Sequence, residues 1–225
     1  MSAPGQSWHW GDGLRRLADC LDAGGLLAIP TESTYGLAVD PLLADGVDRL
    51  FQLKGRPAMK ALPVVLAEVA HLERLGGDPA DPNLVELAAL WPAPLTVVVP
   101  LRQPIPASGG SRSLAVRVPA HDRLRGLLQE LDRPLTATSA NLTGAPPVTD
   151  PEQLPRLLAG QHAVIIEDGR LPGGPPSTIV EPIAAGYRIL RPGALGHDWL
   201  QSRVSKPVFS ADAAEIPADE SGDTR

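Results

Sequence analysis

A short cationic segment is the most distinctive chemical feature of the sequence. It runs Lys54-Gly55-Arg56-Pro57-Ala58-Met59-Lys60 and holds two of the three lysines in a chain with 20 basic residues. Arginine can bind phosphate oxygens in a bidentate way, whereas lysine acts as a compact point charge. Three cations on a segment shaped by Gly and Pro are therefore suited to clamping a polyphosphate. The alternative interpretation is an ordinary solvated loop.

Two further segments carry groups suited to a small zwitterion. The stretch 30–37 supplies the hydroxyls of Thr31 and Thr34 and one carboxylate, although such residues also cap turns by bonding to nearby backbone. Arg117 alternates with apolar residues, so it shares a strand face with Ala115. A charge on a half-buried strand face is costly without a partner. The partner of Arg117 could be the carboxylate or phosphate of a substrate, or it could be an internal Asp or Glu.

Polar, uncharged residues follow another apolar segment. The stretch TSANLTG (138–144) offers hydroxyls and amides that suit adenine, ribose or phosphate, or that form ordinary turn hydrogen bonds. Ser177, in the stretch 176–180, and Arg191, in the stretch 189–193, stand in comparable places. In open α/β sheets, ligand sites gather at such strand ends.

Several familiar catalytic patterns are absent from the sequence. It contains no Gly-x-x-x-x-Gly-Lys-Ser/Thr phosphate loop, no His-Glu-x-x-His pair and no Gly-x-Ser-x-Gly elbow. The five histidines are scattered, so we expect them at the surface and expect no protein-held metal. The single cysteine, Cys20, excludes an internal disulfide and falls on the apolar side of a predicted helix.

Composition narrows the class of protein further. The 225 residues fit one large domain or two small ones, and 43% of them are hydrophobic, enough for a sizeable core. The net charge of −6 and the pI of about 5.3 argue against a surface devoted to nucleic acid. No apolar run resembles a signal peptide or approaches the roughly 20 residues that span a bilayer. We therefore expect a cytoplasmic protein.

Apolar periodicity predicts strands mixed with helices throughout, which indicates an α/β sheet with flanking helices. We expect strands at 26–30, 35–39, 62–66, 95–99, 114–118, 135–138, 163–166, 178–180 and 187–190. We expect helices at 14–21, 47–54, 67–75, 83–91, 121–131 and 151–159. Residues 1–10 are expected to form a loose arm. Residues 1–200 are expected to form one catalytic domain, followed by a disordered acidic tail at 201–225.

Taken in order, these segments resemble the YrdC-type threonylcarbamoyl-AMP synthase family in its single-domain form. The resemblance covers about residues 20–195. Its best-matching stretches are PTESTYGLAVD (30–40), LKGRP (53–57), WPAPLTVVVP (91–100), SLAVRVP (113–119), TSANLTG (138–144), STIV (177–180) and ILRPG (189–193). It implies an α/β fold in which an open, twisted mixed sheet with flanking helices curls around a cationic cleft. It also implies a nucleotidyltransferase, an L-threonylcarbamoyladenylate synthase that makes threonylcarbamoyl-AMP for the t6A modification of tRNA. Its substrates would be L-threonine, bicarbonate and ATP, and its other products pyrophosphate and water.

The resemblance also assigns roles to individual residues. It places Lys54 and Arg56 as the catalytic cations on the ATP phosphates. It implies a threonine site formed by Thr31, Thr34, Arg117, Ala137 and Ser177. It implies an ATP site formed by Lys54, Arg56, Lys60, Ser113, Ser139, Asn141 and Arg191. Mg2+ is expected as a cofactor bound mainly through the ATP phosphates. Relatives often carry His and Ser where this chain has Val65 and Pro147, so these two residues are left out of the expected site.

Partners and alternatives complete the expectation. The resemblance implies hand-over of the product to a tRNA threonylcarbamoyl transferase complex and allows weak, direct binding of tRNA or double-stranded RNA, with no membrane involved. One alternative is an RNA-binding module without catalysis, whose affinity would fall steeply with salt. Another is the related domain of a hydrogenase maturation protein. A chain with one cysteine has no room for that protein's zinc-finger segments.

Overall fold

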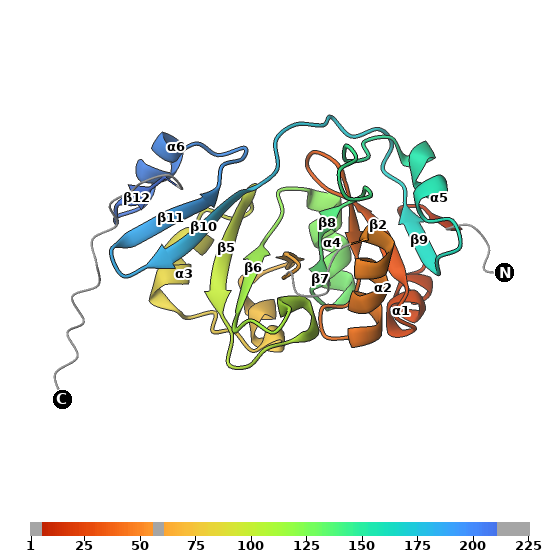
Figure 1. Cartoon of the computed structure of the whole chain (residues 1–225), viewed down its shortest axis with the longest axis horizontal. Coiled ribbons are helices and arrows are strands. Elements are labelled where there is room, and N and C mark those ends of the chain that lie inside the picture. Colours follow the sequence, from red (N-terminus) through yellow and green to blue (C-terminus); the bar gives the residue numbers. More distant parts are fainter. Residues whose placement is uncertain (1–5, 56–60, 211–225) are drawn as a thin grey trace.

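Two hydrogen-bonded sheets form the framework of the protein. The computed structural model describes residues 6–55 and 61–210. One sheet contains, in spatial order, β1 (Gln6–Trp8), β9 (Ala163–Ile166), β2 (Leu26–Pro30), β3 (Tyr35–Ala38) and β8 (Thr138–Ser139). The other contains β12 (Val208–Phe209), β11 (Gly186–Arg191), β10 (Thr178–Ile183), β5 (Leu95–Pro100), β6 (Ser113–Arg117), β4 (Val64–Val65) and β7 (Leu135–Thr136). Figure 1 shows β12 and β9 near opposite ends of the long axis.

Helices flank both sheets. They are α1 (Arg15–Asp22), α2 (Ala44–Lys54), α3 (Pro82–Ala88), α4 (Asp122–Leu131), α5 (Leu154–Leu157) and α6 (His197–Gln201). Three 3₁₀ helices lie at Val69–Leu75, Pro106–Ser108 and Pro151–Gln153. Within the ranges that the structure covers, none of the helices combines the length and apolar character needed to cross a bilayer.

Both sheets are mixed and open. β1, β9 and β2 run parallel, whereas β3 is antiparallel to β2 and to β8. In the larger sheet, parallel and antiparallel pairs alternate from β12 to β7. This architecture confirms the expected α/β class with open mixed sheets and flanking helices. The sequence was interpreted as a single sheet, whereas the hydrogen bonds divide the strands between two sheets.

The chain passes from one sheet to the other at Ala137. Thr136 pairs with Val64 in the seven-stranded sheet, and Thr138 pairs with Leu37 in the five-stranded sheet. The single strand expected at this point is therefore two short strands, one in each sheet. As a result, the edges of the two sheets meet at a seam beside Ala137.

The central strand of the five-stranded sheet, β2, is buried on both faces. In β2, Leu27 and Ile29 pack in a core cluster with α1 and α4. Leu26 and Ala28 pack in the larger cluster, which includes side chains of α2, the helix in front of this sheet in Figure 1. Because alternate residues of a strand point to opposite faces, both faces must be apolar. This explains the uninterrupted apolar run that precedes Thr31.

Three expectations about individual segments are wrong. Residues 6–8, expected in a loose arm, form β1, which pairs with β9. β12, expected in a disordered tail, pairs with β11, so the fold continues past residue 200. His71, expected at the surface, is buried. Two- and three-residue strands are too short to show apolar periodicity, which is why the sequence did not indicate them.

Candidate active site

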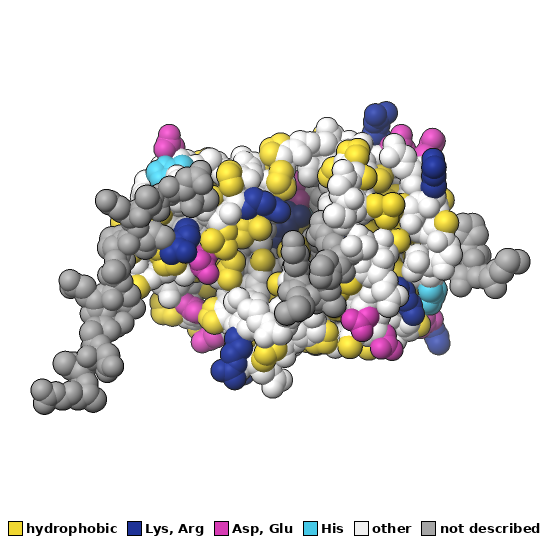
Figure 2. All heavy atoms as spheres, in the orientation of Figure 1, with side chains coloured by type: hydrophobic (Ala, Val, Ile, Leu, Met, Phe, Trp, Pro, Cys, Tyr) yellow, Lys and Arg dark blue, Asp and Glu magenta, His cyan; other side chains and the backbone are white. Residues whose placement is uncertain are grey.

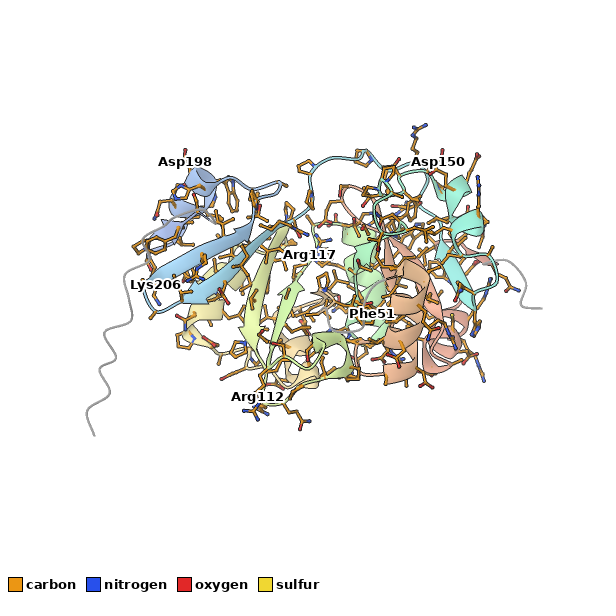
Figure 3. The ribbon with its side chains drawn as sticks, viewed as in Figure 1. Phe51, Arg112, Arg117, Asp150, Asp198 and Lys206 are labelled. Atoms are coloured by element: carbon orange, nitrogen blue, oxygen red, sulfur yellow. The ribbon has the colours of Figure 1, made fainter. Side chains whose placement is uncertain are left out.

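A cavity of about 510 Å³ lies at the seam between the two sheets. Seven of the site residues expected from the sequence line it: Thr31, Thr34, Arg117, Ala137, Ser139, Ser177 and Arg191. Figure 3 labels Arg117 near the centre of the molecule. In the same orientation, Figure 2 shows dark blue basic atoms within a hollow there. Residues more than 150 positions apart in the chain are therefore brought to one site.

The lining combines cations, hydroxyls and an apolar wall. The guanidinium groups of Arg117 and Arg191 line the cavity together with Ser and Thr side chains. No described lining residue is an Asp or a Glu. The apolar part comprises Ala61, Pro63, Val64, Val65, Ala115 and Ile179, among others. Such a cavity suits a small anionic ligand that also carries apolar groups.

Arg117, the last residue of β6, is held by an internal carboxylate. Its Nη1 donates to Glu32 Oε1 at 2.7 Å and to Glu32 Oε2 at 2.8 Å, and Ala120 N donates to the same carboxylate at 2.7 Å. Burial opposes ionisation of Glu32, but the Arg117 guanidinium beside it keeps the pKa of that carboxyl below its ordinary value. The sequence allowed either an internal carboxylate or a substrate anion as the partner of Arg117. Glu32 is the internal partner, and Arg117 also lines the cavity.

Arg191, the last residue of β11, is fixed against Ser177. Its Nη2 donates to Ser177 O at 2.8 Å and to Ser177 Oγ at 3.3 Å, while Thr96 Oγ1 lies 2.8 Å from the same Oγ. Burial, and then the nearby charge of Arg117, lower the pKa of Arg191. The two positive guanidinium groups repel each other across the cavity, so an anion bound between them would be stabilised.

Lys54 lies behind the cavity instead of lining it. Its side chain is 2% exposed, and its Nζ donates to Ser139 O at 2.5 Å, Asn141 O at 3.1 Å and Asn141 Oδ1 at 3.0 Å. Gly55 takes the left-handed conformation, with φ of 60°, and ends α2 directly after it. A buried ammonium must have its donors satisfied within the protein, and acceptors on Ser139 and Asn141 do this in the described structure. Lys54 therefore supports the segment that carries Ser139, and its expected contact with the phosphates stays a prediction.

Two other expected nucleotide contacts are not in the cavity lining. Ser113 starts β6 on the face of Arg117 but at the far end of the strand, where its Oγ lies 2.9 Å from Ser111 Oγ. The neighbouring Arg112 is labelled at that end in Figure 3. Asn141 accepts from Ser139 Oγ at 2.7 Å and does not itself line the cavity. Arg56 and Lys60 lie outside the described residues.

Sequence reasoning missed several cavity residues. Val65 and Pro147, left out of the expected site, both line it. The position of Val65 follows from strand pairing, since it stands opposite Arg117 between β4 and β6. Thr96 also lines the cavity, and its one sequence signal is a hydroxyl inside an apolar strand. Glu32 was noted as a carboxylate, but its partner 85 residues away was not identified.

A second hollow, of about 700 Å³, lies beside α1 and β9. It is larger, but its described lining contains none of the expected site residues. Cys20 borders it, and burial raises the pKa of this thiol to about 11, which leaves it a poor nucleophile. The chemistry therefore favours the cavity at the seam.

These features define a class: an α/β protein with a cationic cavity, suited to small anionic molecules, at the ends of its strands. Comparison with known proteins identifies the family. Residues 19–193 match the model of the Sua5–YciO–YrdC family, whose description reads "telomere recombination". The chain belongs to this family, as its motifs indicated.

Two relatives carry the same enzyme name. A threonylcarbamoyl-AMP synthase of Pyrococcus abyssi is 32% identical over 213 residues, and the match covers 91% of this chain and 63% of the relative. The enzyme of the same name from Methylococcus capsulatus is 37% identical over 184 residues, covering 81% of this chain and 98% of the relative. The crystal structure of P. abyssi Sua5 complexed with L-threonine is similar with a TM-score of 0.78 and 31% identity. That match covers 91% of this chain and 62% of the archaeal one.

Proposed function

We propose that the protein is an L-threonylcarbamoyladenylate synthase that joins L-threonine, bicarbonate and ATP. The observation that carries this proposal is the cavity shared by Arg117, Arg191 and a set of hydroxyl groups. The names of the two relatives, and the L-threonine bound to the P. abyssi protein, support the same activity. Since the chain spans 63% of the length of the Pyrococcus relative, the activity is proposed for this cavity alone.

The proposed reaction needs no nucleophile from the protein. The amino group of threonine captures bicarbonate or CO2 to give N-carboxythreonine, and water is released overall. The new carboxylate attacks the α-phosphorus of ATP, the bond to the bridging oxygen breaks, and pyrophosphate leaves with the electron pair. Because one substrate supplies the nucleophile, the protein must mainly orient the reactants and stabilise negative charge.

The cavity offers two groups of side chains for these tasks. Arg117, with Thr31, Thr34, Ala137 and Ser177, would hold the amino acid. Its guanidinium suits a carboxylate, and the hydroxyls suit the remaining polar atoms. Ser139 and Arg191 would contact the nucleotide.

Three cations of the segment 54–60 complete the proposed phosphate site. Arg56 and Lys60 are proposed to contact the phosphates on the basis of the sequence. Lys54 would act indirectly by holding the Ser139 carbonyl in place. Neutralisation of the developing charge on the phosphates is the contribution that such cations make to phosphoryl chemistry.

The nucleotide is proposed to enter as its magnesium complex. Among the residues that the structure describes, no group of three or more His, Cys, Asp or Glu side chains is placed to hold a metal ion. The hydroxyl groups of the cavity do not by themselves fit a resident Mg2+, which prefers carboxylate, phosphate and water oxygens. The phosphates of ATP would supply most of its ligands.

The product is proposed to pass to a transferase that modifies tRNA.

A measurement of pyrophosphate release tests the activity. We expect release to require ATP, L-threonine and bicarbonate together. The other interpretation is an RNA-binding module without catalysis. It predicts no release above background beside salt-sensitive binding of double-stranded RNA.

A further inference from the structure

The buried strand β5 carries a single hydroxyl, which faces the cavity. Thr96 is 1% exposed and lines the cavity, whereas its neighbours Leu95 and Val97 are fully buried and apolar. Within the described chain, the Thr96 hydroxyl has one hydrogen-bond partner, Ser177 Oγ at 2.8 Å. A buried hydroxyl in an apolar strand therefore serves Ser177 and no other described group.

Either hydroxyl could be the donor in this hydrogen bond, and the surrounding groups favour Thr96. The Thr96 proton needs an acceptor because the side chain is buried, and Ser177 Oγ supplies it. The Nη2 of Arg191 lies 3.3 Å from the same oxygen and can act only as a donor. With Thr96 as the donor, Ser177 Oγ accepts two hydrogen bonds, and its own proton points away from both donors.

We propose that Thr96 is a positioning residue for the amino-acid substrate. Together with Arg191, it orients the Ser177 hydroxyl so that its proton points into the cavity as a donor. The carboxylate of the amino acid is the acceptor, because Arg117 lines the same cavity and offers the matching positive charge. The inference rests on the proposed function, since it names the amino-acid substrate of that cavity.

The energetic advantage is preorganisation. A serine hydroxyl that is free to rotate must give up that freedom when it binds a ligand. A hydroxyl that already accepts from two fixed donors has one direction left in which to donate. Thr96 is held by β5, which pairs with both β10 and β6, so the orienting group itself is rigid.

Substitution of Thr96 tests the inference. Thr96→Val removes the hydroxyl, while the β-branched shape suits a buried strand. We expect the Kd for L-threonine, measured by calorimetry without nucleotide, to rise about 3- to 10-fold, the scale of one hydrogen bond. The Kd for ATP is expected to stay unchanged. Thr96→Ser keeps the hydroxyl and is expected to retain most of the wild-type affinity for L-threonine.

A double-mutant cycle separates positioning from general packing. Ser177→Ala removes the proposed donor, so adding Thr96→Val to it should not change the Kd further. Thr136→Val is the matched control. Thr136 is equally buried and its Oγ1 accepts from Val39 N at 2.9 Å, but it does not line the cavity. Its Kd for L-threonine is expected to equal that of the wild type.

Several results would overturn the inference. One is an unchanged Kd for L-threonine in Thr96→Val, and another is an equal rise of that Kd in Thr136→Val. The others are additive effects of Thr96→Val and Ser177→Ala on the Kd, or a rise in the Kd for ATP alone. Formation of threonylcarbamoyl-AMP by the wild type is measured separately. A protein that binds L-threonine through this network but makes no adenylate would contradict the proposed function alone.

Discussion

Arg117 and Glu32 form an ion pair that joins the two sheets beside the cavity. Arg117 ends β6 in the seven-stranded sheet, and Glu32 lies in the turn between β2 and β3 of the five-stranded sheet. Both carboxylate oxygens lie within 2.8 Å of the Nη1 atom. The carboxylate thus occupies one end of the guanidinium fork, which leaves the remaining donors of Arg117 for a ligand.

Loss of Arg117 is expected to weaken binding of the amino acid. Arg117→Ala should lower kcat/KM for L-threonine about 10- to 100-fold, because hydrogen bonds to charged groups contribute roughly 1.5 to 3 kcal/mol. Arg117→Lys should recover part of the loss, since it keeps the charge but not the planar fork. Steady-state kinetics with varied L-threonine is the measurement.

Arg112→Ala is the matched control for this substitution. Arg112 is exposed at the opposite end of the same hairpin, away from Arg117 (Figure 3). Its kinetics should match the wild type. Equal losses in both variants would show that β6 needs basic residues for a reason unrelated to the cavity.

The ion pair also predicts how stability depends on pH. The folded-state pKa of Glu32 is lowered by Arg117 in spite of burial. A carboxyl with a depressed pKa adds stability above its unfolded pKa of about 4.3 and loses it as pH falls through the folded value. Glu32→Gln should therefore lower the free energy of unfolding at pH 7 by about 1.5 to 3 kcal/mol. The difference from the wild type should shrink as pH falls below about 4.

Chemical denaturation at pH 7 and at acidic pH measures this difference. Glu68→Gln, at an exposed position before the 3₁₀ helix Val69–Leu75, is the control and should match the wild type at pH 7. A constant gap between Glu32→Gln and the wild type at every pH would mean that ionisation of Glu32 does not contribute.

Lys54 is expected to matter for stability as well as for activity. Lys54→Met leaves the carbonyls of Ser139 and Asn141 without their buried donor, which should cost about 1 to 3 kcal/mol. Adenylate formation should fall because Ser139 loses its support. Thermal denaturation and ATP titration measure the two effects. An unchanged melting temperature would refute the supporting role.

The control for this substitution is Lys206→Met. Lys206 is only partly buried and bonds Asn83 Oδ1 at 2.9 Å, in a region remote from the cavity. We expect a smaller loss of stability and unchanged ATP binding.

The backbone near Ser177 leaves no room for a side chain at Gly193. A Cβ there would lie 2.3 Å from Pro176 O and 2.6 Å from Ser177 C. Gly193→Ala should therefore displace Ser177 and lower kcat/KM about 10- to 100-fold, as small misplacements of site groups do. Gly196→Ala meets nothing within 4 Å and should be close to neutral. Similar kinetics for the two variants would show that the position of Ser177 is not critical.

Much of the fold could be predicted because the signals are local. The uninterrupted apolar run at 26–30 and the helical pattern at 121–131 are properties of neighbouring residues, and both elements are present as β2 and α4. The hydroxyls of Thr31 and Thr34 follow a strand, so their place at a strand end was predictable too. β12 is too short for periodicity, and pairing with β11 fixes its place.

The parts of the site that could not be predicted depend on long-range partners. Glu32 has its donor, and Lys54 has an acceptor, 85 residues away in the chain. Their charges could therefore be read from the sequence, but their contacts could not. This is why the support that Lys54 gives to Ser139 was not expected from the sequence. Thr96 was missed because a threonine in a strand has no distinctive sequence context.

Product formation shows whether two small molecules react with each other in the cavity at the seam. The purified protein is incubated with ATP, L-threonine and bicarbonate, and threonylcarbamoyl-AMP is identified by mass spectrometry beside pyrophosphate release. We predict both products in equal amounts, neither product when any one of the three substrates is omitted, and slower formation of both products when Arg117 is replaced by Ala. Absence of the adenylate with all three substrates present, from a folded protein that binds ATP and L-threonine, would contradict the account.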